Sequence, residues 1–423
     1  MMSVRRFVTL IMLMLACPAI VRGDEICYVP SLAISEQYNN NILLATDADN
    51  IRKDYITIPS LGFAMTDKTV RLDSLLSLQV QRLLYSRNEE LDATNQHYNG
   101  SIRYSATPLL NVSAEAGYAK DSNPSLGSAT SSSSLPPTHD SNTGGGNTSS
   151  STTLPLIATP VESILASASM DYHMTETTSL SAMYQFGWSS YEIPQYRDTS
   201  HDAKAGLVID LSKDLPRVNG RINTGYSQYL FPDSKTINVM GTIGFSYDIS
   251  KAWTILVDGG MRRTDTEIFV NQLAPFGNQQ QDYTETAGTG QLSLSYQGEY
   301  TGAELHYIQD FTMAYLASGH QTPAQRQALT FTARHQITGE LSAVLVAGYT
   351  TYTTAHVLTQ TNVTISPVIR YDLARMSGER DLALEASYEH TRIDYIASGT
   401  AYRDLFFILL TVRFPYCSSS QYK

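Results

Sequence analysis

The chain has 423 residues, of which 42% are apolar, 10% aromatic and only 16% charged, with a formal net charge of −11. Soluble domains average roughly 25% charged residues; here Ser, Thr, Asn, Gln, Gly and 27 tyrosines replace the missing charge. The aromatic content excludes a disordered chain, and the acidic balance argues against nucleic acid as a partner. Beyond the N-terminus there is no apolar run of roughly 18 residues, which excludes a multi-span helical membrane protein.

Residues 1–23 are predicted to form an export signal peptide. Two arginines open the segment, residues 7–16 form an apolar run of suitable length, and residues 21–23 approximate a small-x-small cleavage site. A lipoprotein signal ending at Cys17 is the alternative. In either case the mature chain leaves the cytoplasm.

From residue 24 to residue 414, segments of about ten to fourteen residues alternate apolar and polar side chains. Leu76, Leu78 and Val80, for example, share one face, while Ser77 and Gln79 share the other. Alternation at period two predicts half-buried strands. The segments exceed the five or six residues typical of soluble strands and reach the roughly 9–11 that span a bilayer when tilted. The sequence therefore predicts an all-β fold, a transmembrane antiparallel up-and-down β-barrel.

Eighteen strands are predicted, with sixteen as the alternative count. Short connections alternate with long ones, which is the asymmetry of outer-membrane barrels. The barrel must close, because lipid leaves no partner for a free strand edge, and an even count places both termini in the periplasm. The predicted strands are residues 31–39, 54–66, 69–85, 95–107, 109–121, 160–173, 178–191, 200–213, 219–231, 236–248, 252–264, 283–297, 302–314, 326–338, 341–353, 360–372, 381–394 and 401–414.

Two segments stand apart from the alternating pattern. Residues 121–159 are rich in Ser, Thr and Gly, so we expect an extracellular loop that is either flexible or folded inward to narrow the pore. Residues 415–423 follow the last strand and are expected to form a periplasmic tail.

The last predicted strand carries an unbroken apolar stripe. Phe406, Ile408, Leu410, Val412 and Phe414 alternate with smaller or polar residues and end on an aromatic ring. The stripe resembles the C-terminal signal that the outer-membrane insertion machinery reads. Outer-membrane lipid and that machinery are therefore expected partners.

The polar faces of the strands are expected to line the lumen. An Arg or Lys facing lipid at the bilayer midplane would cost roughly 2–4 kcal/mol, so charged side chains should point inward. They could bind sugars and screen ions, or pair with one another to brace the wall. Glu285 faces the same lumen, and the predicted pore-lining residues are Arg71, Asp73, Gln79, Arg103, Glu115, Asp171, Lys204, Asp210, Arg221, Asp258, Arg262, Glu304, Asp310, Arg334, Arg370, Asp372, Glu385, Glu389 and Arg413.

The sequence does not predict a catalytic or metal site. His97, His306, His335 and His390 fall on separate strands, with no compact arrangement of nucleophile, base and orienting group. The chain contains no CxxC, HExxH or acidic calcium-loop motif. We therefore expect a protein that is not an enzyme and needs no cofactor.

Three short segments carry a resemblance to a known family. They are residues 35–42 (Ser-Glu-Gln-Tyr-Asn-Asn-Asn-Ile), 54–61 (Asp-Tyr-Ile-Thr-Ile-Pro-Ser-Leu) and 95–98 (Asn-Gln-His-Tyr). In these segments the chain resembles the outer-membrane β-barrel porins that accompany exopolysaccharide and exosortase gene clusters. The resemblance implies a passive conduit for exopolysaccharide in a Gram-negative outer membrane, with a periplasmic polysaccharide export protein as partner. The alternatives are a general diffusion porin for small solutes and, third, an enzyme or receptor on a barrel scaffold.

Two of the three cysteines lie beyond the predicted signal, Cys27 before the first predicted strand and Cys417 after the last. In a closed barrel the first and last strands are neighbours, so both thiols should reach the same periplasmic rim. The predicted export takes the chain to a compartment where disulfides persist. We expect a Cys27–Cys417 disulfide, the alternative being two free thiols in the terminal tails.

Overall fold

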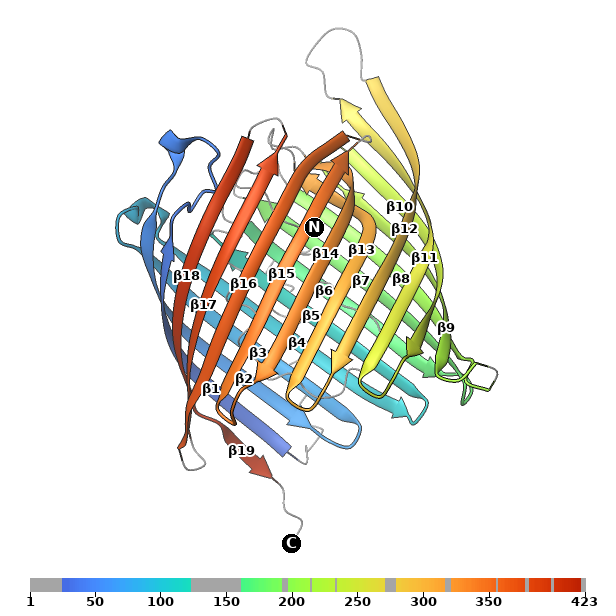
Figure 1. Ribbon diagram of the computed structural model, residues 1–423, viewed down its shortest axis with the longest axis horizontal. Coiled ribbons are helices and arrows are strands. Elements are labelled where there is room, and N and C mark those ends of the chain that lie inside the picture. The colour runs from blue at the N-terminus through green and yellow to red at the C-terminus, as the bar shows by residue number, and fades with distance from the viewer. Residues whose placement is uncertain are drawn as a thin grey trace.

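The computed structural model describes residues 25–122, 161–191, 197–213, 215–232, 234–270, 279–315, 321–354, 357–376, 380–396 and 399–419. The predicted signal peptide and residues 123–159 of the predicted long loop lie outside these ranges. Within them the chain forms one closed antiparallel β-barrel (Figure 1). The described residues include no helix that is both long and apolar enough to cross a membrane.

The barrel wall has eighteen strands, which confirms the predicted count over the alternative of sixteen. A short strand, β19 (Tyr416–Ser419), follows the wall inside the segment that was expected to be a tail. The wall strands are β1 (Glu25–Asn39), β2 (Asp54–Lys68), β3 (Leu72–Tyr85), β4 (Ala93–Thr107), β5 (Leu110–Asp121), β6 (Val161–His173), β7 (Thr178–Tyr191), β8 (Arg197–Asp210), β9 (Val218–Leu230), β10 (Ser234–Asp248), β11 (Trp253–Val270), β12 (Gln279–Gln297), β13 (Thr301–Tyr315), β14 (Gln321–Gln336), β15 (Leu341–Thr354), β16 (Val357–Met376), β17 (Arg380–Tyr395) and β18 (Gly399–Arg413).

The barrel closes where β1 meets β18. β1 pairs with β2 along one edge and with β18 along the other, from Ser31 opposite Arg413 to Asn39 opposite Leu405. Below this seam β19 pairs with the first residues of β1, and Cys27 lies directly opposite Cys417. The two cysteines form a disulfide with an S–S distance of 2.06 Å. β1 therefore begins before the predicted residue 31, because its first residues pair with β2 and β19.

The outer surface is an apolar belt. Ile243, Met261 and Leu61 point outward and keep 68%, 65% and 62% of their surface exposed, far more than a soluble core would allow. Aromatic pairs lie at both ends of the strands, with Tyr38 against Tyr55 at the outer end and Trp253 against Tyr296 near the short turns. An apolar band between aromatic girdles is the lipid-facing surface of a transmembrane barrel. The protein is an outer-membrane β-barrel of the Gram-negative type.

One part of the inner wall is apolar, which the sequence did not predict. Ile42, in the connection after β1, is buried with Ile56, Leu83 and Leu405, whose side chains face inward from β2, β3 and β18. Asn41 anchors this segment, because its amide Nδ2 donates to the carbonyl oxygen of Tyr402 at 2.9 Å. The connection after β1 therefore folds against the inside of the barrel near its outer end.

Candidate functional site

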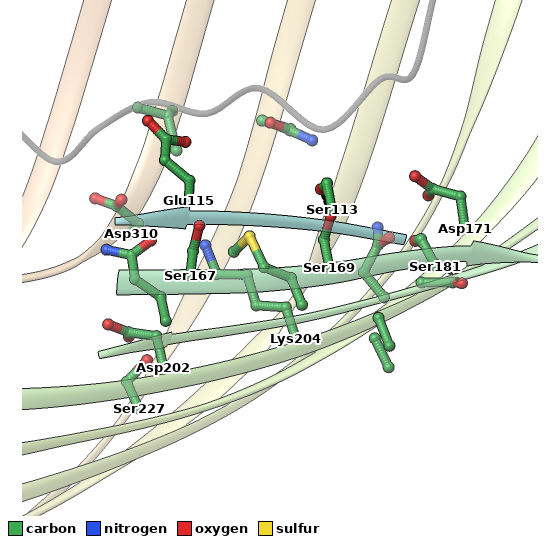
Figure 2. Close-up of a pocket in the computed structure, with 18 of the residues that line it drawn as sticks. Ser113, Glu115, Ser167, Ser169, Asp171, Ser181, Asp202, Lys204, Ser227 and Asp310 are labelled. Atoms are coloured by element: carbon green, nitrogen blue, oxygen red, sulfur yellow. Dashed lines mark hydrogen bonds between the residues drawn. The ribbon is translucent and has the colours of Figure 1, made fainter. Parts of the chain in front are cut away.

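The lumen contains a cavity of about 2200 Å³, lined by residues of β2 to β14 and of the short connections between them. Its wall at β5–β7 consists largely of small hydroxyls, among them Ser113, Ser167, Ser169 and Ser181 (Figure 2). Ser113 and Ser169 face each other on neighbouring strands, with their hydroxyl oxygens 2.6 Å apart. Hydroxyls both donate and accept hydrogen bonds, so this wall can replace part of the hydration shell of a polar solute.

Four charged side chains from β5, β6 and β8 project into the cavity: Glu115, Asp171, Asp202 and Lys204 (Figure 2). Glu115 accepts a hydrogen bond of 3.3 Å from the Asn99 amide. Within the described part of the chain, none of these four has an oppositely charged group within 4.0 Å. Their field therefore acts on the contents of the cavity, and carboxylates outnumber the ammonium group.

The arginines on the adjoining wall, in contrast, are paired. The Arg221 Nε lies 3.6 Å from Asp258 Oδ1, and the Arg262 Nη2 lies 3.7 Å from Glu285 Oε1. Gln291 donates to the other Asp258 oxygen at 2.6 Å. Arg262 is only 2% exposed. The first pair links β9 to β11 and the second links β11 to β12. Within each pair the opposite charges largely cancel.

At its outer end β13 separates from β12, while β14 stays paired with β15 as far as Gln325 opposite Thr353. Pairing between β12 and β13 stops at Gly290 opposite Gln309, whereas pairing between β13 and β14 continues to Tyr315 opposite Gln321. At the point of separation, the Gln309 side-chain amide donates to the carbonyl oxygen of Gly288 at 3.2 Å. Beyond it, β11 and β12 rise above the barrel, and β13 and β14 curve over the lumen (Figure 1).

Phe311 shows how far this hairpin enters the lumen. Its ring centroid lies 6.0 Å from that of Tyr229 on β9, and the guanidinium carbon of Arg262 lies 5.2 Å from its centroid. β10, β11 and β12 stand between β9 and β13 in the wall, so at about 4.8 Å per strand the two would be roughly 19 Å apart along it. The contact is made because β13 turns inward, away from β12, and packs against the inner face of β9 and β11.

The structure brings about half of the predicted pore-lining residues into this cavity. Arg71 instead lies in the turn between β2 and β3, and Asp210 is the last residue of β8, where it accepts a 2.8 Å hydrogen bond from the Ser212 backbone. Both are therefore at the periplasmic rim rather than within the barrel. The predicted residues that line the cavity are Asp73, Arg103, Glu115, Asp171, Lys204, Arg221, Asp258, Arg262 and Asp310.

The other predicted residues share the inner face but lie outside this cavity. Their neighbours in sequence, such as Leu78, Ile369 and Leu384, are exposed on the lipid side, so alternation turns them inward. Several form ion pairs: Arg370 with Asp372 at 3.1 Å, and Glu389 with Arg403 at 2.5 Å. The full set is Gln79, Glu304, Arg334, Arg370, Asp372, Glu385, Glu389 and Arg413.

Comparisons with known proteins return barrels of the outer membrane. No protein-family model matches the chain, and no curated protein matches it. Among solved structures, OccAB4 of Acinetobacter baumannii has a TM-score of 0.45 at 9% identity, covering 94% of this chain and 99% of that one. OccK2 (OpdF) of Pseudomonas aeruginosa has a TM-score of 0.43 at 11% identity, with 94% and 98% covered. The siderophore receptor PirA of P. aeruginosa has a TM-score of 0.42 at 9% identity, with 92% and 80% covered.

Proposed function

We propose that this barrel is a passive diffusion channel for small polar solutes across the outer membrane. The observation that carries the proposal is the cavity of about 2200 Å³, with its hydroxyl wall and its unpaired Glu115, Asp171 and Asp202. A lining of many weak hydrogen-bonding groups lets a solute exchange hydration water for protein contacts without being held tightly. Such a lining supports passage better than storage or catalysis.

Small solutes fit this lumen better than a polymer does. Two elements narrow its outer end, the connection after β1 that carries Ile42 and the β13–β14 hairpin that carries Phe311. A monosaccharide, amino acid or ion can pass such elements one molecule at a time. A polysaccharide would have to keep the whole passage open along its length.

The exopolysaccharide conduit is the competing hypothesis, and one comparison separates the two. Liposomes that contain the purified protein should swell rapidly in small sugars and more slowly as the sugar becomes larger. Deleting the gene should leave surface polysaccharide unchanged. Polymer trapped in the periplasm of the deletion strain, with no swelling in small sugars, would contradict the proposal and favour the conduit.

A further inference from the structure

We infer that β19 presents an open strand edge at the periplasmic rim and that this edge receives an extended segment of a periplasmic protein. Each strand of the wall pairs with a neighbour along both of its edges. Within the described part of the chain, β19 pairs with β1 alone. Figure 1 shows β19 below the barrel, past the end at which the short turns lie. A strand added there would leave the lumen untouched, so this role is separate from conduction.

The strand that covers the same edge higher up ends before it reaches β19. β17 begins at Arg380, and its pairing with β18 begins at Asp381 opposite Arg413. Cys417 follows Arg413 by four residues and is exposed. Among the described residues, no strand lies against this side of β19. The edge that β17 covers along β18 is therefore uncovered along β19.

Two observations show where the backbone groups of Cys417 point. The Cα atoms of Cys27 and Cys417 are 4.0 Å apart, nearer to the roughly 4.5 Å of a non-hydrogen-bonded antiparallel pair than to the roughly 5.5 Å of a hydrogen-bonded one. In the same register the Phe414 N–H donates to the Pro30 carbonyl oxygen at 3.0 Å. The two kinds of pair alternate along the ladder, so the position three residues on is not hydrogen-bonded. Both observations direct the N–H and carbonyl of Cys417 away from β1, toward the open edge.

An open edge of this kind is suited to bind an extended polypeptide. Unpaired backbone donors and acceptors along an edge are a template for another strand, and β-augmentation uses these main-chain hydrogen bonds for affinity. Tyr416, beside Cys417, is 61% exposed, and its ring can pack against an apolar side chain of an added strand. The disulfide holds β19 against β1, so less entropy is lost on binding than if the edge had first to form.

A second copy of this chain does not fit the edge. Two identical strands that pair antiparallel are related by a two-fold axis perpendicular to their sheet. In a transmembrane barrel that axis lies in the plane of the membrane and would turn the second barrel upside down. A two-fold axis along the membrane normal keeps both barrels upright, but it sets each N–H against the same N–H of the copy. The occupant is therefore a different polypeptide, reached from the periplasm.

Amide hydrogen exchange tests whether the edge is open. Beyond the predicted signal the chain has only two cysteines, so ¹⁵N-cysteine gives two amide resonances from the disulfide-bonded protein. Tyrosine labelled with ¹³C at the carbonyl identifies Cys417, because it follows Tyr416, whereas Cys27 follows Ile26. The Cys27 amide faces β2, opposite Thr66. It should exchange about 100-fold more slowly than the Cys417 amide, since an amide inside a sheet exchanges only when the sheet opens.

A capped synthetic peptide of alternating Thr and Val is the probe for the partner segment. It should slow exchange at Cys417 about tenfold, the effect of gaining one hydrogen bond, and leave exchange at Cys27 unchanged. A fully N-methylated copy, which has no backbone donor, should have no effect. The Ser419 backbone faces the same edge as Cys417, two residues on. Ser419→Pro removes its N–H and should weaken peptide binding about tenfold, while Ser419→Ala should not.

Two results would overturn the inference. If the Cys417 amide is as protected as the Cys27 amide without peptide, the edge is already covered. If it exchanges rapidly and the peptide does not slow it, the edge is hydrated and binds no strand. Neither result changes the conductance expected of the barrel, so the proposed function is tested separately.

Discussion

Asp310 and Arg326 face each other across β13 and β14 and join through two hydrogen bonds, Nε to Oδ1 at 2.8 Å and Nη2 to Oδ2 at 2.6 Å. Because the pair is neutral as a unit, it adds little field to the cavity that it borders. Arg221 and Arg262 are offset in the same way by Asp258 and Glu285. Glu115, Asp171, Asp202 and Lys204 have no such ion pair among the described residues, so their field acts on the β5–β8 side of the cavity.

That residual field predicts a preference for cations. Glu115, Asp171 and Asp202 outnumber Lys204 among the unpaired groups that line β5 to β8. Under a KCl gradient, the reversal potential should have the sign of a channel that is more permeable to K⁺ than to Cl⁻. The triple variant E115Q/D171N/D202N should shift it toward Cl⁻.

A variant with the same change in net charge is the control for this experiment. E89Q/E176Q/E299Q alters three exposed carboxylates in connections between strands, none of which lines the cavity, and its reversal potential should equal that of the unaltered protein. An anion-selective unaltered channel would show that the field has been assigned to the wrong residues.

The two faces of β3 predict opposite results for one kind of substitution. Leu76 faces lipid and Gln79 faces the lumen, three residues away on the same strand. Leu76→Arg places a guanidinium in the apolar belt at a cost of roughly 2–4 kcal/mol, so the yield of folded, heat-modifiable barrel should fall sharply. Gln79→Arg should fold normally, and equal yields from both variants would show that the faces are reversed.

Asp54 is expected to stabilise the outer rim in a pH-dependent way. It lies at the outer end of β2, and its carboxylate accepts hydrogen bonds from the backbone of Tyr55, Arg87 and Asn88 and from the Asn88 side chain. Burial raises the pKa of this carboxyl, but the Asn88 amide and the backbone donors together outweigh burial and hold the pKa below its ordinary 3.8. A lowered pKa in the folded state stabilises the protein above pH 3.8 and loses this contribution as pH falls through the folded-state pKa.

Asp54→Asn should therefore destabilise the barrel at neutral pH by about 1.5–3 kcal/mol, the range for hydrogen bonds to a charged group. Urea unfolding in detergent at several pH values measures this difference, which should shrink as the pH is lowered below 3.8. The exposed Asp49→Asn is the control. The free energy of unfolding of Asp54→Asn is compared with that of the unaltered protein. If the difference stays constant from pH 7 to pH 3, the Asp54 carboxylate does not stabilise this rim.

The Cys27–Cys417 bond closes a loop with a sequence separation of 390 residues. In the chain-entropy model a closed loop of that length restricts the unfolded state by about 5 kcal/mol. The C27S/C417S variant should still insert, because the β1–β18 ladder remains, but it should unfold at lower urea concentration. Treating the unaltered protein with a reductant should produce the same shift, and an identical midpoint with and without reductant would mean that the thiols are free in solution.

The wall could be predicted from the sequence because lipid imposes the same demand on every strand. Leu76 and Gln79 are assigned to opposite faces by alternation alone, and the even count follows from closure. Strand ends were harder to place. β11 continues to Val270, beyond the predicted residue 264, because outside the bilayer a hairpin can extend without any apolar stripe.

The lumen was predicted less well, since its contents depend on contacts between distant residues. Leu305, Tyr307 and Phe311 share the apolar face of β13, and only Gln309 interrupts it. One polar residue in the stripe does not show that the strand leaves the wall there. Only Tyr229 and Arg262, far away in sequence, determine where Phe311 packs. Ile42 likewise follows a predicted strand and finds its apolar neighbours only when β2, β3 and β18 come together.

Single-channel recording of the purified, disulfide-bonded protein in planar bilayers is the most direct test of the central claim. We expect discrete, ohmic conductance steps that decrease when small neutral sugars enter the lumen and remain unchanged when the sugars are too large to enter. A folded, heat-modifiable barrel that inserts and produces no conductance steps would contradict it.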